Sequence, residues 1–282
     1  MNNQNIKFAF WGTPKIASDT LSIMKNCGYI PSLIITSIDK PSGRGMQLTE
    51  SPVSIWAKEN NIECLKPEKI NEEFLNELNS KNLDIYIVVA YGKILGEELI
   101  NLPKLGTINI HYSLLPKYRG ASPVEQALLN GDATTGISIQ QMKYKLDSGP
   151  ILESKEVPIY FNESKEELFT KLIEEGANML CNILPKIINK EIIPKEQDEK
   201  DATFCSKIKK EDGLLNLEDN GRINYNKYRA YKGWPDTYFF TKNNKRIKVS
   251  KARYENDLFI IEKVIPEGKK EVNYSDFLKS NI

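Results

Sequence analysis

Short apolar runs alternate with amphipathic stretches over the first two-thirds of the chain. Residues 6–11 and 83–90 are apolar almost throughout, a pattern typical of parallel strands that are covered on both faces. Stretches with apolar residues at helical spacing stand between such runs and predict helices. The expected strands are 6–11, 30–36, 63–65, 83–90, 106–110, 136–142 and 151–159, and the expected helices are 14–28, 51–58, 71–79, 93–100, 123–130 and 165–188. This succession predicts an α/β fold with a doubly wound, mostly parallel, Rossmann-like sheet.

The pattern changes towards the C-terminus. A charged stretch, Lys195–Asp201, has the composition of a linker. From residue 204 onward, Tyr, Phe, Val and Ile recur in short runs between turn signals such as Lys242-Asn243-Asn244, which predicts a small and mainly β unit. We therefore expect a first domain at 1–194, a linker at 195–203 and a small β-rich domain at 204–282. An irregular loop is expected at 37–50.

Composition limits the class of protein. The chain has 282 residues, of which 40% are apolar and 27% charged, and its mean hydropathy of −0.45 is typical of a soluble globular protein. No apolar run approaches the ~18 residues of a membrane span, and the first residues lack the pattern of a secretory signal. A cytoplasmic protein without a membrane partner is therefore expected. The scattered cysteines indicate neither a metal site nor a disulfide framework. They are Cys27, Cys64, Cys181 and Cys205.

The net charge of +1 hides an uneven distribution of charge. Residues 204–282 carry 17 lysines and arginines against 11 aspartates and glutamates, so this part is basic and the remainder is acidic. Between Lys242 and Arg253 the basic residues are not interrupted by a single acid. Such a run indicates either a strand edge protected by lysines or a surface that contacts a phosphate backbone. Lys245, Arg246 and Lys248 are the candidate nucleic-acid contacts within it.

His111 is the only histidine, and it stands where the predicted strand 106–110 gives way to a turn. A single histidine is often structural, but polar side chains at the carboxyl end of a parallel strand open onto the crevice in which α/β enzymes carry out their chemistry. Asn109 lies on the same strand, and Asp147 lies in a tight turn between two apolar strands. An imidazole, an amide that stabilises an oxyanion and a carboxylate suffice for acyl transfer without a covalent enzyme intermediate. For Asp147, an ordinary turn residue remains the alternative.

Several other signatures are missing from the sequence. Gly-x-Gly-x-x-Gly does not follow the first strand, and a Walker-type phosphate loop does not occur, which disfavours a dinucleotide or nucleoside triphosphate site. Ser113 stands beside His111, but no Gly-x-Ser-x-Gly elbow surrounds it. We therefore expect Ser113 to position a ligand and not to act as a nucleophile.

The block Asn-Ile-His-Tyr-Ser-Leu-Leu-Pro-Lys-Tyr-Arg-Gly-Ala-Ser-Pro at 109–123, with Met-x-x-x-Leu-Asp-Ser-Gly-Pro at 142–150, resembles the signature of the folate-dependent formyltransferases. The resemblance is closest to the branch that formylates methionyl-tRNA. It covers nearly the whole chain, including Phe-Trp-Gly-Thr-Pro at 10–14 and Val-Val-Ala-Tyr-Gly-Lys-Ile-Leu at 88–95. It implies transfer of a formyl group from 10-formyltetrahydrofolate to the α-amino group of methionine on charged initiator tRNA, without a metal.

The resemblance also implies residue roles. Asn109 corresponds to the amide that stabilises the oxyanion, His111 to the residue that moves the proton, and Asp147 to the acid that supports it. The folate pocket would be lined by two facing segments. They are Ser113, Leu114, Leu115 and Pro116, and the backbone of Val88, Ala90, Tyr91 and Gly92.

The loop at 40–50 matches the segment that reaches the tRNA acceptor stem in this family. Met46 and Gln47 stand where relatives often carry lysines, which leaves Lys40 and Arg44 as its main positive charges. The family's C-terminal β-barrel usually has more strands between segments like Lys248-Val249 and Phe259-Ile260-Ile261. The resemblance therefore implies a shortened, partial OB-like barrel, and we expect a monomer.

Two other functions remain open. One is the same chemistry on an amino sugar nucleotide, and the other is RNA binding without catalysis on an inactive scaffold. The basic tail and the cationic loop favour tRNA over a sugar nucleotide. The joint presence of Asn109, His111 and Asp147 argues against an inactive scaffold.

Overall fold

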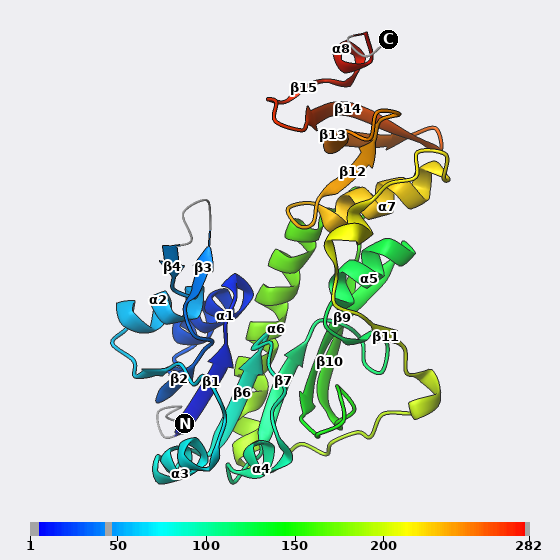
Figure 1. Ribbon diagram of the computed structural model, residues 1–282. Coiled ribbons are helices and arrows are strands. Elements are labelled where there is room, and N and C mark those ends of the chain that lie inside the picture. Colours follow the sequence, from blue (N-terminus) through cyan, green and yellow to red (C-terminus); the bar gives the residue numbers. More distant parts are fainter. Residues whose placement is uncertain (1–5, 43–46, 280–282) are drawn as a thin grey trace. The chain divides into compact units, whose positions relative to one another are not determined.

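The computed structural model describes residues 6–42 and 47–279 (Figure 1). These residues form two compact units, each assembled from separate stretches of the chain. The first unit contains the described residues up to 119 together with 136–157 and 170–203, and the second contains 120–135, 158–169 and the chain from 204 onward. The expected division at 1–194, 195–203 and 204–282 stays a prediction. Two stretches before residue 170 belong with the C-terminal part.

A seven-stranded sheet forms the centre of the first unit, in the order β10-β9-β7-β6-β1-β2-β5. Its strands are β1 (Phe8–Gly12), β2 (Leu33–Ile35), β5 (Cys64–Leu65), β6 (Ile85–Val89), β7 (Thr107–His111), β9 (Thr134–Gln141) and β10 (Ile151–Pro158). β1 pairs in parallel with β2 and β6, and β6 with β7, whereas β9 runs antiparallel to β7. The chain winds outward from β1 to β5 and returns to β6 on the other side of β1. The expected doubly wound, mostly parallel α/β fold is confirmed.

The helices of this unit are α1 (Lys15–Asn26), α2 (Pro52–Glu59), α3 (Glu72–Ser80), α4 (Glu97–Asn101) and α6 (Lys165–Ile188), the last of which extends into both units. Two of them, α2 and α3, begin at polar side chains that cap them. Ser51 accepts a hydrogen bond from the Ser54 amide at 3.0 Å, and Asn71 accepts one from the Phe74 amide at 3.1 Å. Both side chains satisfy amides that the first turn of a helix leaves unpaired.

Side chains alternate between the two faces of the sheet. Trp11 and Val88 project to one face, where they pack with residues of α3 and α4. Ile110 projects to the other face, where Gly176 allows α6 to approach closely. The strands therefore lie between two helical layers, which explains why they appear in the sequence as continuous apolar runs.

The loop expected to be irregular at 37–50 contains a hairpin in its described part. β3 (Lys40–Ser42) pairs antiparallel with β4 (Gln47–Thr49). The Lys66 ammonium binds both flanks of the hairpin, 2.7 Å from Asp39 and 3.3 Å from Glu50. This hairpin was not predicted because its strands are short and one contains Pro41, a residue depleted in strands.

The second unit contains a four-stranded antiparallel sheet in the order β12-β13-β14-β15. Its elements are α5 (Pro123–Asn130), α7 (Gly221–Tyr231), β12 (Thr237–Phe240), β13 (Arg246–Glu255), β14 (Leu258–Pro266), β15 (Val272–Asn273) and α8 (Tyr274–Lys279). The remaining short elements of the chain are β8 (Arg119–Gly120), β11 (Phe204–Cys205) and the 3-10 turns Glu199–Asp201 and Lys210–Gly213.

A tight hairpin explains the short C-terminal unit. Asn256 and Asp257 alone connect β13 to β14, and both adopt positive φ angles, 50° and 61°, as a two-residue hairpin turn requires. The segments Lys248-Val249 and Phe259-Ile260-Ile261 therefore lie on two strands that follow each other directly. In a complete barrel, further strands would stand between them. Among the described residues, β12 and β15 are the two edges of this sheet.

Helix α7 is absent from the sequence-based expectation. Its buried side is largely polar, because Asn224, Asn226 and Arg229 are all buried there. The Arg229 guanidinium donates hydrogen bonds to the carbonyl oxygens of Leu128 and Tyr160, at 3.4 and 3.3 Å. A helix that is held by polar contacts shows no apolar period in its sequence.

Candidate active site

The register of the sheet brings four polar side chains to one face at the end of β7. Asn109 pairs with Gln140 of β9, and His111 pairs with Ser138. Paired residues of neighbouring strands share a face, so all four project to the side that carries Val88. The alternation of Ile and polar residues over 137–140 is the sequence signal that predicts this polar face, and the expected site residues omitted Gln140 and Ser138.

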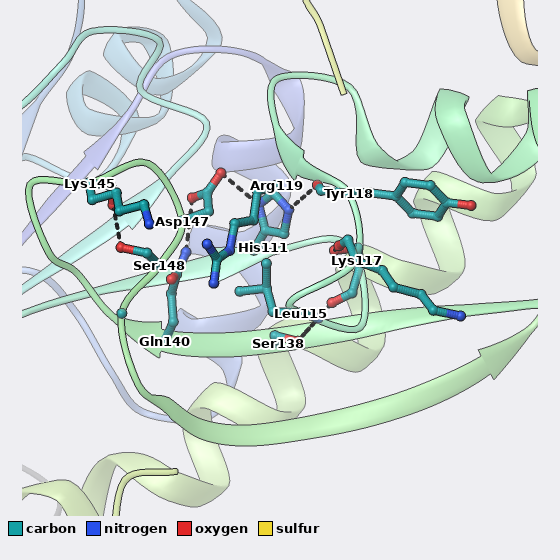
Figure 2. A network of polar contacts seen from close by, with 12 residues as sticks. His111, Leu115, Lys117, Tyr118, Arg119, Ser138, Gln140, Lys145, Asp147 and Ser148 are labelled. Atoms are coloured by element: carbon teal, nitrogen blue, oxygen red, sulfur yellow. Dashed lines mark hydrogen bonds and ion pairs between the residues drawn. The ribbon is translucent and has the colours of Figure 1, made fainter. Parts of the chain in front are cut away.

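His111 is held in one orientation and one tautomer. Its side chain is 6% exposed, and its Nε2 lies 2.8 Å from the carbonyl oxygen of Tyr118. Because a carbonyl oxygen only accepts, Nε2 carries the hydrogen in this contact, and Nδ1 of the neutral ring has a lone pair. Nδ1 lies 3.7 Å from Oδ2 of Asp147 (Figure 2). The basic nitrogen of the only histidine therefore faces a carboxylate.

Asp147 is directed towards His111 by its backbone and by Gln140. Its φ angle of 45° lies in the left-handed region, which is unusual for a residue with a side chain. The Gln140 amide donates to Oδ1 at 2.9 Å, which leaves Oδ2 facing the histidine (Figure 2). Gly149 fixes the same turn, because a Cβ there would lie 1.6 Å from the Gln141 carbonyl oxygen. These contacts hold the Asp147 side chain towards His111, and its catalytic role stays a prediction.

Asn109 retains an unused amide. Its side chain is half-buried, and it forms no hydrogen bond within the described part of the chain. Gln140 likewise has a buried Oε1 that accepts no hydrogen bond from the described residues. Polar atoms of this kind are normally satisfied in proteins, so they indicate where a bound molecule supplies partners.

The loop at 113–116, which is expected to line one side of the folate pocket, is held partly by hydrogen bonds within the protein. Ser113 is fully buried and donates to the Lys117 carbonyl oxygen at 2.6 Å. Ser138 accepts a hydrogen bond from the Leu115 amide at 3.0 Å and donates to the Ser113 carbonyl at 2.8 Å. The Ser113 hydroxyl is therefore used within the loop, and its expected role in positioning a ligand stays a prediction. Leu114 and Pro116 remain partly exposed.

The other segment expected to line the folate pocket, at 88–92, lies at the end of β6. The strand order of the sheet reverses here, between β1 and β6. Doubly wound sheets bind ligands at the carboxyl ends of the strands at such a point. Val88 is paired with Asn109 across β6 and β7, so the two expected functions, folate binding and oxyanion stabilisation, meet in adjacent strands. Ala90 and Gly92 adopt positive φ angles, 49° and 81°, and are exposed.

The aromatic ring of Tyr91 turns inward instead. It packs edge-on against Trp11 at 5.2 Å between ring centroids, and burial raises the pKa of its hydroxyl to about 12. Its carbonyl oxygen accepts a hydrogen bond from Thr13 at 3.3 Å, which ties the end of β6 to the end of β1. Tyr91 can thus present only its backbone to a ligand, as the resemblance implies.

The residues expected to bind tRNA fall into two groups. Lys40 is exposed on β3 of the first unit, whereas Arg44 lies outside the described residues. In the second unit, Lys248 binds Asp236 at 2.5 Å and the Arg246 guanidinium lies 4.0 Å above the Tyr238 ring. Lys245 is exposed and forms no ion pair with another described residue.

The last basic residues of the run 242–253 form ion pairs with a carboxylate of the same sheet. Lys251 binds Glu262 at 2.9 Å, and Arg253 binds the same carboxylate at 2.8 Å. Both contacts hold the pKa of Glu262 below its usual value. A run that contains no acid in the sequence therefore has acidic partners from the adjacent strand β14. The most accessible positive charges remaining are Lys242 and Lys245.

The described residues contain no group of three or more His, Cys, Asp and Glu side chains that could hold a metal ion. None of the helices described is long and apolar enough to cross a membrane.

Comparisons with known proteins agree with this geometry. Residues 6–184 match the formyl transferase family, and 207–260 match its C-terminal domain. The methionyl-tRNA formyltransferase of Thermotoga neapolitana is 42% identical over 245 residues, which cover 86% of this chain and 78% of that protein. The corresponding protein of Dictyoglomus thermophilum is 35% identical over 97% of this chain and 96% of its own length.

Solved structures share the fold at much lower identity. An N-formyltransferase from Helicobacter canadensis, in complex with folinic acid and dTDP-3-aminofucose, has a TM-score of 0.65 and 18% identity over 95% of this chain and 98% of that one. This likeness bears on the fold alone, whereas the sequence matches cover nearly the whole chain. The chain therefore belongs to the formyl transferase family.

Proposed function

We propose that this formyltransferase transfers a formyl group from 10-formyltetrahydrofolate to the α-amino group of methionine on charged initiator tRNA. The strongest support is the position of His111, whose Nδ1 lies 3.7 Å from the Asp147 carboxylate on the face of the sheet that carries the Asn109 amide. The names of relatives that are 35–42% identical support tRNA as the acceptor.

His111 and Asp147 together accept the proton that the attacking amine must lose. The proton moves to Nδ1, because Nε2 already carries a hydrogen that is donated to the Tyr118 carbonyl. The ring then becomes a cation, 3.7 Å from a negative oxygen of Asp147, which stabilises the protonated ring. The ring returns the proton to the leaving nitrogen of the folate as the bond between that nitrogen and the formyl carbon breaks, and proton transfer of this kind contributes ~10²–10⁴-fold to rate.

Asn109 stabilises the negative charge that develops on the formyl oxygen. Its amide is on the same face as His111, and it has no partner within the described residues. A donor of this kind is worth about 3–4 kcal/mol of transition-state stabilisation. The folate supplies the formyl group, and the backbone of Val88, Ala90 and Gly92 with the partly exposed Leu114 and Pro116 would hold it next to Asn109.

The tRNA assignment includes the hairpin β3–β4 and the exposed lysines of the second unit. Lys40 on the hairpin and Lys245 in the tail have accessible ammonium groups suited to phosphate oxygens. We also propose that the protein acts in the cytoplasm as a monomer. Sedimentation of the full chain tests the monomer.

One assay separates tRNA from the sugar nucleotide alternative. The full chain is given 10-formyltetrahydrofolate with either charged initiator tRNA or an amino sugar nucleotide, and formyl transfer is measured at several acceptor concentrations. We expect kcat/KM to be far higher with the tRNA. A higher kcat/KM with the sugar nucleotide would identify that molecule as the acceptor in place of tRNA. Transfer to neither acceptor would refute the proposal.

A further inference from the structure

Gln197 makes four hydrogen bonds through one side-chain amide. Its Nε2 donates to the carbonyl oxygens of Asp147 and Gly149, at 2.9 and 2.6 Å. Its Oε1 accepts from Nε and Nη2 of Arg119, at 3.0 and 2.7 Å. The orientation of the amide is fixed, because a guanidinium only donates and a carbonyl oxygen only accepts. Both ends of the amide are therefore fully used.

Arg119 anchors this arrangement from the other side of the site. Its guanidinium is fully buried, and the Glu199 carboxylate binds Nη1 at 2.9 Å. Glu199 also binds Lys145 at 2.6 Å, and hydrogen bonds from Lys145 and then Arg119 lower its pKa. A buried cation requires partners of this kind, so Arg119 cannot readily leave them.

The stretch 195–203, which we call the strap, thus touches both loops of the site. Lys195 and Ile151 exchange backbone hydrogen bonds of 2.8 and 2.7 Å beyond the Asp147 turn. At its other end, Thr203 accepts a hydrogen bond from the Tyr118 amide through its hydroxyl, at 2.8 Å. The Tyr118 carbonyl is the group that binds His111 Nε2. The strap therefore connects the partner of the histidine to the turn that carries the carboxylate.

We propose that Gln197 is a positioning residue that sets the separation between His111 and Asp147. This inference rests on the proposed function, in which that pair moves the proton. Gln197 touches neither side chain. It holds the backbone of the Asp147 turn at a fixed distance from Arg119, which follows directly on Tyr118 in the chain. The left-handed φ of Asp147 is strained, and two hydrogen bonds to carbonyls of the same turn oppose its relaxation.

The amide is required by this geometry. A glutamate at 197 has the same shape and still accepts from Arg119, but it loses both hydrogen-bond donors. Its carboxylate would then face the carbonyl oxygens of Asp147 and Gly149, and the repulsion would push the turn away. Gln197→Glu therefore changes one side of the amide only, whereas Gln197→Ala removes both.

The first test is a kinetic comparison in the full-length protein. We expect Gln197→Glu and Gln197→Ala to lower kcat for formyl transfer by about 10²-fold, the cost of a small misplacement of reacting groups. KM for the folate and for the tRNA should be unchanged. The matched control is Glu196→Gln, which removes the surface ion pair with Lys143 from the neighbouring position of the strap. It should leave both constants at the wild-type values.

The second test does not require activity. His111 is the only histidine, so the ¹⁵N NMR signals of its ring are unambiguous in the free enzyme. We expect these shifts in both Gln197 variants to move towards those of Asp147→Asn, in which the carboxylate is lost, while Glu196→Gln stays at the wild-type values. Folding is checked by circular dichroism, and if Gln197→Glu does not fold, Gln197→Ala carries the test.

The outcomes distinguish the two proposals. Wild-type ring shifts and wild-type kcat in a folded Gln197 variant would overturn the positioning role. A wild-type enzyme that formylates no charged tRNA would overturn the proposed function, whereas the ring shifts would still report whether Gln197 sets the position of Asp147. A raised KM with unchanged kcat would show that the strap acts on binding and would also overturn the inference.

Discussion

The amide of Gln140 donates a hydrogen bond of 2.9 Å to the carboxylate of Asp147. This contact occupies one carboxylate oxygen and leaves the other directed at His111. Because Gln140 is paired with Asn109 in the strand register, adjacent strands carry the proposed oxyanion donor and the residue that orients Asp147. Groups held on strands keep their geometry better than groups held on loops.

Replacement of Asp147 by asparagine should impair catalysis severely. The substitution keeps the shape but removes the charge that stabilises protonated His111, so we expect kcat to fall by about 10²-fold or more. Circular dichroism should show a folded protein. Near-normal turnover would return Asp147 to the role of an ordinary turn residue.

His111→Ala should also reduce turnover by at least ~10²-fold, because it removes the base. It leaves the Tyr118 carbonyl without its donor, which should lower the free energy of unfolding by about 1–3 kcal/mol. Folate affinity, measured by equilibrium binding, should remain close to that of the wild type. An unchanged turnover would exclude the proton-transfer mechanism.

Gly149→Ala should distort the turn through a backbone clash. The new Cβ would meet the Gln141 carbonyl oxygen, so we expect a loss of about 3 kcal/mol or more in urea unfolding and a matching loss of activity. The control is Gly28→Ala, where φ is +88° and nothing lies within 4 Å of the added atom. There only the backbone cost of about 1–2 kcal/mol applies. Equal stability of the two variants would contradict the clash.

Neutralisation of Lys245, Arg246 and Lys248 should weaken tRNA binding and its dependence on salt. Each lost phosphate contact lowers the slope of log affinity against log salt by roughly 0.7–0.9. Lys248 already binds Asp236 and Arg246 covers Tyr238, so Lys245→Ala should have the largest single effect. Lys15→Ala, which breaks a surface pair with Asp19, serves as the control. If the slope does not change, these residues protect a strand edge.

Arg44→Ala should raise KM for charged tRNA or lower kcat with it. Arg44 lies outside the described residues, and the expectation rests on the cationic sequence of its loop. A charge-assisted phosphate contact is worth ~1.5–3 kcal/mol, which corresponds to about a 10- to 150-fold effect. Folate binding should not change. A wild-type rate of tRNA formylation would favour an acceptor bound deep in the crevice.

The sequence predicted those elements whose evidence is local. The helices predicted at 51–58 and 71–79 start at the caps Ser51 and Asn71, and the helices 123–130 and 165–188 have the predicted bounds. Helix α7 was not predicted because Asn226 and Arg229 hold it through hydrogen bonds to carbonyl oxygens of a distant segment. Apolar periodicity carries no information about such a helix.

The same limit applies to the site. Asn109 and His111 stand close together in the chain, so their motif could be recognised, whereas Gln197 meets the Asp147 carbonyl across 50 residues. Gln197 lies in a charged stretch that was predicted to be a linker. Composition alone does not reveal which side chain of such a stretch forms hydrogen bonds to a buried arginine. The paired charges of β13 and β14 are hidden for the same reason, since their partners come from another strand.

The discontinuous units have a consequence for how the protein is made. Arg229 donates to the Leu128 carbonyl, 101 residues earlier in the chain. At a translation rate of ~5–20 residues per second, α5 leaves the ribosome about 5–20 s before the helix that packs on it. During that time Val124, Ala127 and Leu128, which are buried in the finished protein, have no partner from α7. The apolar side of α5 is therefore exposed on the nascent chain for several seconds, until residues 221–231 have been synthesised.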